Sequence, residues 1–244
     1  MGKAWPVVFL MVIVIAPMIL LVSADYWIFR EDHYAKHFEN GIYDDFNEDF
    51  PDDTKEEIDS IAYELLGYMG DKDHSVLAVP EGFFSPDELS HMEDVRTLVL
   101  KGKYFLHGLL ILLIILTALL AAVSYLVIPK LWVSYFFKYL GASLTYAPMI
   151  LLLLSTAFFV ALENFSSVFV SFHNVFFPQG NWQFPEDASL VRLFPEEFFK
   201  STGENIVITA AVVSLVIMGL GIMMSRFGPQ WNLGKKVKVL KQKI

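Results

Sequence analysis

Four runs of apolar residues dominate the pattern of this 244-residue chain. They occupy residues 5–22, 105–128, 144–162 and 206–224, and none of them contains Asp, Glu, Lys or Arg. A helix needs roughly 20 apolar residues to cross the hydrocarbon core of a bilayer. The pattern therefore predicts four transmembrane helices, in a chain whose hydrophobic fraction of 55% is high for a soluble domain.

The segments between these runs are sorted by the sign of their charge. All 27 acidic residues lie in 24–103 and 163–204, whereas the remaining ends and the turn at 129–143 carry lysine and arginine without Asp or Glu. Basic residues beside a membrane helix are retained in the cytoplasm. The sequence therefore predicts an all-α membrane protein with four transmembrane helices, two extracellular, partly helical loops, and both termini in the cytoplasm.

These two patterns define the boundaries of eight segments. The transmembrane helices are expected within residues 1–23, 104–128, 144–162 and 205–225. They are joined by the acidic extracellular loop 24–103, the basic and aromatic cytoplasmic turn 129–143, the aromatic extracellular loop 163–204 and the basic cytoplasmic tail 226–244.

The first span has a second interpretation, as a cleaved signal peptide. Its apolar run is longer than a usual signal core and contains Pro17, so we expect a retained helix. Cleavage would leave three spans and the same outward-facing loops.

Composition excludes several classes of function. The chain has no cysteine, so disulfides, zinc–thiolate sites and thiol nucleophiles are absent. Its net charge of −9 and the confinement of basic tracts to the tail argue against nucleic-acid binding, and favour contact of the tail with anionic lipids. The spans lack the charged residues of a polar transport path. No Gly-x-Ser-x-Gly, phosphate-binding or dinucleotide motif occurs, and we expect no metal or cofactor.

The first outer loop contains two helix signals. One helix is predicted to start at Thr54, as its cap, and to end near Gly67–Gly70. A second is predicted to begin at Ser85, with Pro86 in the first position and Glu88 completing a capping box, and to run on toward the second span. The apolar face of the first helix comprises Ile58, Ile61, Ala62, Leu65 and Leu66.

The second outer loop is rich in phenylalanine, which would be a liability on a free surface. We expect it to lie on the outer leaflet or to pack over the first loop.

Four histidines receive structural interpretations. His33 and His37 have the four-residue spacing of zinc peptidase ligands, but Tyr34 replaces the glutamate base and no third ligand is evident, so we expect surface histidines. His74 is expected in a solvated turn. His107 is expected at the headgroup level of the second span.

His91 and His173 are candidates for chemistry. Asp94 lies three positions after His91 on the same predicted helix, where a carboxylate stabilises a protonated imidazole, and Arg96 could hold an anion or an oxyanion. His173 lies in an apolar, aromatic segment, which should lower its pKa and leave a neutral base at pH 7. A structural hydrogen bond of His173 is an equally open alternative.

Two segments carry a resemblance to a known family. They are FSPDELSHMEDVR at 84–96, and FHNVFF, WQFP and LFPEEFF between 172 and 199. With four spans and two outer loops, they resemble the bacterial integral membrane family that includes the lipoprotein intramolecular transacylase.

The resemblance implies a reaction and a partner. The substrates would be lipoproteins whose N-terminal cysteine carries a diacylglyceryl group. The protein would meet them among the membrane lipids. The sn-2 acyl chain would move to the cysteine α-amino group and give the lyso-form lipoprotein. On this resemblance we expect His91, oriented by Asp94, and His173 to be the acid–base pair. The substrate-binding residues would be Arg96, Asn174 and Trp182.

Two other classes of function stay open on the sequence. A membrane lipid or peptide hydrolase would release a product, whereas transacylation releases nothing. A nonenzymatic sensor or envelope-protein partner would depend on the acidic outer loop more than on the histidines.

Overall fold

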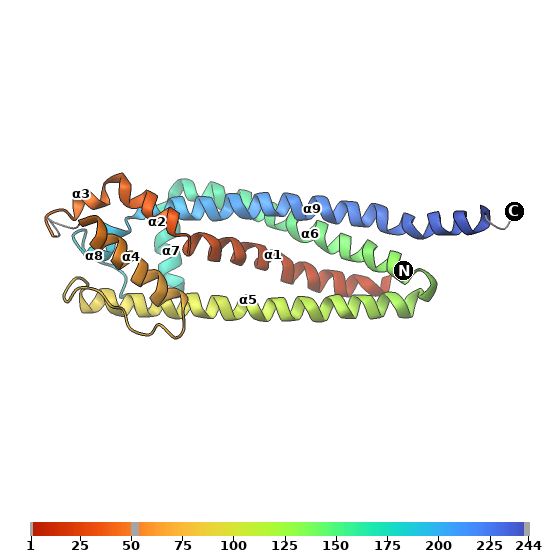
Figure 1. The fold of residues 1–244 in the computed structure, drawn as a ribbon, viewed down its shortest axis with the longest axis horizontal. Helices are drawn as coiled ribbons and strands as arrows, with labels where there is room; N and C mark the ends of the chain where they lie inside the picture. The colour runs from red at the N-terminus through yellow and green to blue at the C-terminus, as the bar shows by residue number, and fades with distance from the viewer. Residues whose placement is uncertain (1, 50–53, 242–244) are drawn as a thin grey trace. The chain divides into compact units, whose positions relative to one another are not determined.

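The computed structural model describes residues 2–49 and 54–241, with side chains up to residue 226, and every regular element among them is helical. Four helices are long and apolar enough to cross a membrane (Figure 1). They are α1 (Trp5–Ile28), α5 (Pro86–Val127), α6 (Trp132–Ala161) and α9 (Glu196–Lys241). Each covers one of the predicted apolar runs to within one residue, so the all-helical, four-span prediction is confirmed.

The remaining elements are short, apart from α4, and most belong to the predicted outer loops. They are η1 (Gly2–Ala4), α2 (Glu31–His37), η2 (Phe38–Ile42), α3 (Tyr43–Asp45), α4 (Thr54–Gly70), η3 (Pro129–Leu131), η4 (Leu162–Asn164), α7 (Phe165–Phe176) and α8 (Ser189–Leu193).

The chain forms two compact units. The bundle unit comprises residues 1–23, 106–158 and 207–244, and the loop unit comprises residues 24–105 and 159–206. The loop unit therefore combines both of the predicted outer loops.

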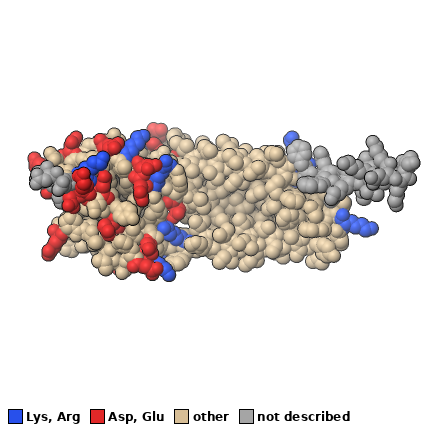
Figure 2. Space-filling model, viewed as in Figure 1, with Lys and Arg blue, Asp and Glu red and all other residues tan. Residues whose placement is uncertain are grey.

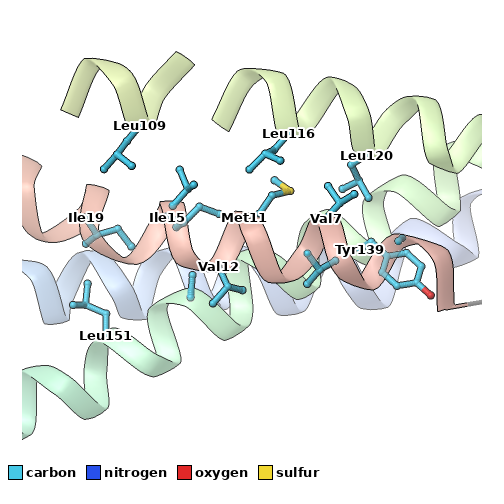
Figure 3. Packing of buried hydrophobic residues seen from close by; sticks show 14 of the residues in the cluster. Val7, Met11, Val12, Ile15, Ile19, Leu109, Leu116, Leu120, Tyr139 and Leu151 are labelled. Carbon is cyan, nitrogen blue, oxygen red and sulfur yellow. The ribbon is translucent and has the colours of Figure 1, made fainter. Parts of the chain in front are cut away.

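In the bundle unit, α1 is the most enclosed helix. Half of its apolar window is buried, against 17–22% for the other three spans. Met11 and its neighbours on α1 pack against Leu116 and Leu120 of α5 and Leu151 of α6 (Figure 3). The other helices expose large apolar side chains. Helix α1 is therefore central to the core of the bundle unit.

Helices α6 and α9 approach closely at two glycines. A Cβ on Gly141 would lie 2.6 Å from the carbonyl oxygen of Gly221, and a Cβ on Gly221 would lie 2.7 Å from the carbonyl carbon of Leu144. Small residues let the backbones of membrane helices approach in this way, where close packing replaces the hydrophobic effect as the source of affinity.

The basic and aromatic segment 129–143 is helical for most of its length. From Trp132 onward it belongs to α6 and is continuous with the third apolar helix. Tyr135 and Tyr139 are buried in the core of the bundle unit.

In the loop unit, the apolar face of α4 forms the centre of a second core. Ile58, Ile61, Ala62, Leu65 and Leu66 are all buried, as the periodicity predicted. The second loop contributes Leu193, Phe194 and Phe198 to the same cluster. Of the two expectations for that loop, packing over the first loop is therefore observed.

An arginine joins the two loops at the edge of this core. Arg192 of α8 donates to Asp45 Oδ2 at 2.8 Å and Asp49 Oδ2 at 2.9 Å, and its guanidinium lies 3.9 Å from the centre of the Phe46 ring. Acidic side chains gather over the surface of the loop unit, and the visible surface of the spans carries none (Figure 2).

Candidate active site

The start of α5 is fixed by the predicted capping box. Ser85 N donates to Glu88 Oε2 at 2.7 Å, and Glu88 N donates to Ser85 Oγ at 3.3 Å. The other oxygen of Glu88 accepts a hydrogen bond of 2.7 Å from Leu190 N, which ties α5 to α8. The first turn of α5 is thereby rigid, and His91 lies one turn later with only 6% of its surface exposed.

Helix α7 supplies the second histidine. His173 is the buried residue of this amphipathic helix and is 8% exposed, whereas Phe172, Val175 and Phe176 are exposed. His173 Nδ1 lies 2.8 Å from the carbonyl oxygen of Phe169. Because a carbonyl oxygen only accepts, Nδ1 must carry the proton, so Nε2 presents a lone pair in the neutral ring.

The structure brings the two histidines together. Their ring centres are 5.8 Å apart and their planes are inclined by 29°. The walls around them are aromatic: the rings of Phe177 and Phe184 contact His91, and Trp182 lies 4.7 Å from His173. The chain thus forms an imidazole pair lined by rings that exclude water.

Burial keeps both imidazoles neutral at pH 7. The pKa of His91 is lowered to about 4, chiefly by burial and also by the nearby His173, while the charge of Asp94 acts in the opposite direction. Burial also lowers the pKa of His173, against the hydrogen bond to Phe169. Both histidines lie outside the four apolar runs of the chain. His91 Nδ1 is buried without a hydrogen-bond partner among the described residues, so it can pair with a ligand.

Asp94 is held by two amide side chains that sequence reasoning missed. Its Oδ2 accepts hydrogen bonds from Gln179 Nε2 at 2.6 Å and Asn181 Nδ2 at 2.8 Å. Gly180 between them has φ +81°, a conformation that glycine adopts without strain. The signal in the sequence that could have identified them is the pair of amide residues within 179–181, in an otherwise aromatic loop.

The other predicted site residues are placed differently. Arg96 donates from Nε to Tyr68 O at 2.7 Å and from Nη2 to Lys72 O at 3.0 Å, so these bonds organise the segment after α4. Its predicted part in binding the substrate stays a prediction. Asn174 is exposed on α7, next to His173.

Three of the other four histidines make structural contacts. Contrary to our surface assignment, His33 and His37 are partly buried; they bond to Thr202 Oγ1 at 2.8 Å and Leu193 O at 3.1 Å. His74 is not simply solvated, because its Nε2 lies 3.0 Å from Glu64 Oε2. His107 is exposed on α5. No group of three or more His, Asp or Glu side chains in the described part of the chain could hold a metal ion.

Known proteins agree with this architecture. A solved structure of the membrane integral lipoprotein intramolecular transacylase Lit from Bacillus cereus superposes with a TM-score of 0.75 at 19% identity, covering 91% of this chain and 96% of that one. Structures of two single-histidine variants of that protein, to arginine and to alanine, give TM-scores of 0.71 at 18% identity over 91% of this chain and 92% and 94% of theirs. At this identity the likeness shows the fold.

The sequence itself identifies the family. No curated protein matches the chain significantly. The family model for the lipoprotein intramolecular transacylase Lit matches residues 8–199, which include both histidines and three of the four spans. This integral, multi-pass membrane protein therefore belongs to the lipoprotein intramolecular transacylase family.

Proposed function

We propose that this protein transfers the sn-2 acyl chain of a diacylglyceryl lipoprotein to the α-amino group of the lipoprotein's N-terminal cysteine, by acid–base catalysis at His91 and His173. The observation that carries the proposal is the stacked pair of buried, neutral imidazoles between aromatic walls. The family supplies the class of reaction.

The chemistry requires one base and one acid. The α-ammonium first loses a proton to give the amine, whose nitrogen then attacks the ester carbonyl carbon. The new carbon–nitrogen bond forms, the bond from that carbon to the glycerol oxygen breaks, and a second nitrogen proton ends on the glycerol oxygen. A positioned histidine accelerates such transfers by about 10²–10⁴-fold.

The tautomer of His173 supports its role as the proton acceptor. Its Nδ1–H is held by Phe169 O, so Nε2 takes the proton from the attacking nitrogen and returns it to the leaving oxygen. His91, with an unpartnered Nδ1, is placed to bond the reacting ester or amine. Asp94 stabilises positive charge on this pair, since its carboxylate raises the pKa of His91.

The substrate itself supplies much of the rate enhancement. The ester and the amine belong to one molecule, so holding them in contact can contribute about 7–11 kcal/mol. Trp182 and the phenylalanines exclude water, which would otherwise hydrolyse the ester. Asn174, beside His173 on α7, is proposed to contact the glyceryl group.

The test is mass spectrometry of a diacylglyceryl-cysteine lipopeptide after incubation with the purified protein. Total mass is conserved, so fragmentation must locate one acyl chain on nitrogen. His91→Ala and His173→Ala should each abolish transfer, and His107→Ala, the matched control, should retain it. Full transfer by the double variant H91A/H173A would reject the mechanism, and release of free fatty acid would favour the hydrolase alternative.

We also infer that the loop unit lies on the outer face of the membrane, with both termini in the cytoplasm. The support is that all acidic residues lie in the loop unit, whereas the ends and the turn of the bundle unit carry lysine and arginine without Asp or Glu.

The absence of cysteine makes this topology directly measurable. Ser60→Cys on α4 should react with a membrane-impermeant maleimide in intact cells, and Lys130→Cys in η3 should react only after permeabilisation. Both native residues are exposed, so the reverse pattern would invert the topology.

A further inference from the structure

A second feature of the loop unit lies beside the histidine pair and shares Phe184 and Asn181 with the site described above. It is an open groove of about 660 Å³, formed by residues 82–88 at the start of α5 and residues 179–189 after α7. Its volume falls within the range of about 300–1,000 Å³ that is typical of ligand sites.

The groove is continuous with the active site. Phe184 lines the groove, and its ring centre lies 5.6 Å from that of His91. Asn181 also lines it and donates hydrogen bonds to Ser90 Oγ and Asp94 Oδ2 on the helix that carries His91. A molecule that reacts at the histidines therefore has a path along the groove.

The chemistry of the groove does not suit an acyl chain. Three amide side chains, from Gln179, Asn181 and Gln183, line it, and such groups both donate and accept hydrogen bonds. The Oδ1 atom of Asn181 is buried without a hydrogen-bond partner among the described residues. A hydrogen-bond donor on a bound ligand would remove the free-energy cost of leaving this acceptor unpaired.

The charge of the groove is negative. Asp87 and Asp187 are exposed on its walls, and neither lysine nor arginine occurs among the described residues that line it. The buried Glu88 forms part of the same wall, where its two hydrogen bonds to backbone N–H groups fix the position of residues 85 and 190. The groove therefore offers a rigid wall, amide groups and exposed carboxylates.

We propose that this groove binds the polypeptide that follows the lipidated cysteine, and that Asp87 and Asp187 select lipoproteins with cationic residues next to that cysteine. The inference rests on the proposed function, because the histidine pair fixes where the cysteine lies. The amide side chains pair with the peptide backbone, whatever its sequence, and the carboxylates add the preference for lysine or arginine.

The first experiment compares three substrates: diacylglyceryl-cysteine amide alone, and lipopeptides with the sequences Cys-Ser-Lys-Lys-Lys and Cys-Ser-Glu-Glu-Glu. The lysine peptide should have the lowest KM. The double variant D87N/D187N should raise the KM for that peptide by about two- to tenfold, as expected for exposed ion pairs, and leave kcat unchanged. High salt should remove the difference, because it screens exposed charges.

The single cysteine amide is the internal control, because it does not reach along the groove. Its KM should be the same for the double variant and the unmodified protein. Glu31→Gln, which removes an exposed carboxylate from α2 outside the groove, should leave the KM for all three substrates unchanged. Equal KM values for the two peptides, or an equal response of all three substrates to D87N/D187N, would overturn the proposal.

A binding measurement separates this proposal from the proposed function. A fluorescent dialkyl ether analogue of the lysine peptide has no ester to transfer, but keeps the α-ammonium and the peptide. In nanodiscs it should bind more tightly than the glutamate analogue, with the difference reduced in D87N/D187N. If the analogues bind in this way but the ester substrates show no acyl transfer, the proposed reaction is rejected and the peptide-binding groove is retained. Equal Kd values for the two analogues would reject the groove, whatever the rate of transfer with the ester substrates.

Discussion

The two units of this protein use polar side chains in opposite ways. In the bundle unit, several buried hydroxyls bond within their own helix: Ser124 Oγ donates to Leu120 O and Ser143 Oγ donates to Tyr139 O. In the loop unit, polar side chains join segments far apart in the sequence, as in the bonds from Leu190 to Glu88 and from Asn181 to Asp94.

This difference follows from the surroundings that each surface is built for. A helix in hydrocarbon must satisfy its polar groups internally, and its association depends on close packing. A unit in contact with water can bring charged groups together where burial and geometry make their interaction favourable. Close packing of side chains therefore stabilises the bundle unit, whereas hydrogen bonds between segments far apart in the sequence fix the histidine geometry in the loop unit.

The largest expected effect comes from breaking such a bond next to the histidines. Replacing both amide donors of Asp94, in Gln179→Met with Asn181→Leu, should lower kcat by up to about 100-fold, because the two histidine-bearing segments lose their register. The KM for diacylglyceryl-cysteine amide and the melting temperature should change little. The assay is initial rate against concentration of that substrate.

The control for this variant is Asn164→Leu, which removes an amide whose side chain makes no capping hydrogen bond at the start of α7. Its kcat should match that of the unmodified protein. An unchanged kcat in the double variant would show that Asp94 needs neither donor.

The next effect tests packing in the bundle unit. Gly221→Leu places side-chain atoms against the α6 backbone and should destabilise the protein by about 1–3 kcal/mol. Gly219→Leu, two residues earlier on α9 and facing open space, is the matched control and should have little effect. Thermal unfolding in detergent measures both, and equal melting temperatures would contradict close packing at Gly221.

A smaller effect is expected at the capping box. Ser85→Ala removes the oxygen that accepts from Glu88 N and should cost about 1 kcal/mol in local stability. Hydrogen exchange of the amides at 88–91 should become faster, because the first turn of α5 frays. Ser60→Ala in the middle of α4 should not change that exchange, and protection at 88–91 unaffected by S85A would refute the role of the cap.

The last predicted effect is the dependence on pH. A histidine whose pKa is lowered by folding contributes stability that is complete above its unfolded pKa of 6.5 and is lost as the pH falls toward its folded pKa, which is about 4 for His91. The melting temperature should therefore decline between pH 6.5 and pH 4, and the decline should be shallower in His91→Gln. Parallel declines in both proteins would contradict a neutral, buried His91.

The sequence determined the elements of this fold because their causes are local. Runs of apolar residues long enough to span a bilayer predicted the four helices, and the sign of the flanking charges predicted their orientation. The capping box at Ser85 and Glu88 and the apolar face of α4 also depend on residues within one or two turns, and both are observed.

The tertiary structure decided the site, because its contacts join distant segments. Spacing related His91 to Asp94 on one helix, but no local rule relates either residue to His173 on α7 or to Gln179 and Asn181 beyond it. The same limit explains Arg96, whose partners at the end of α4 and just after it lie more than twenty residues away in the sequence. Which polar groups meet is set by how the two loops fold over a shared core, and a single sequence does not encode that pairing in any local pattern.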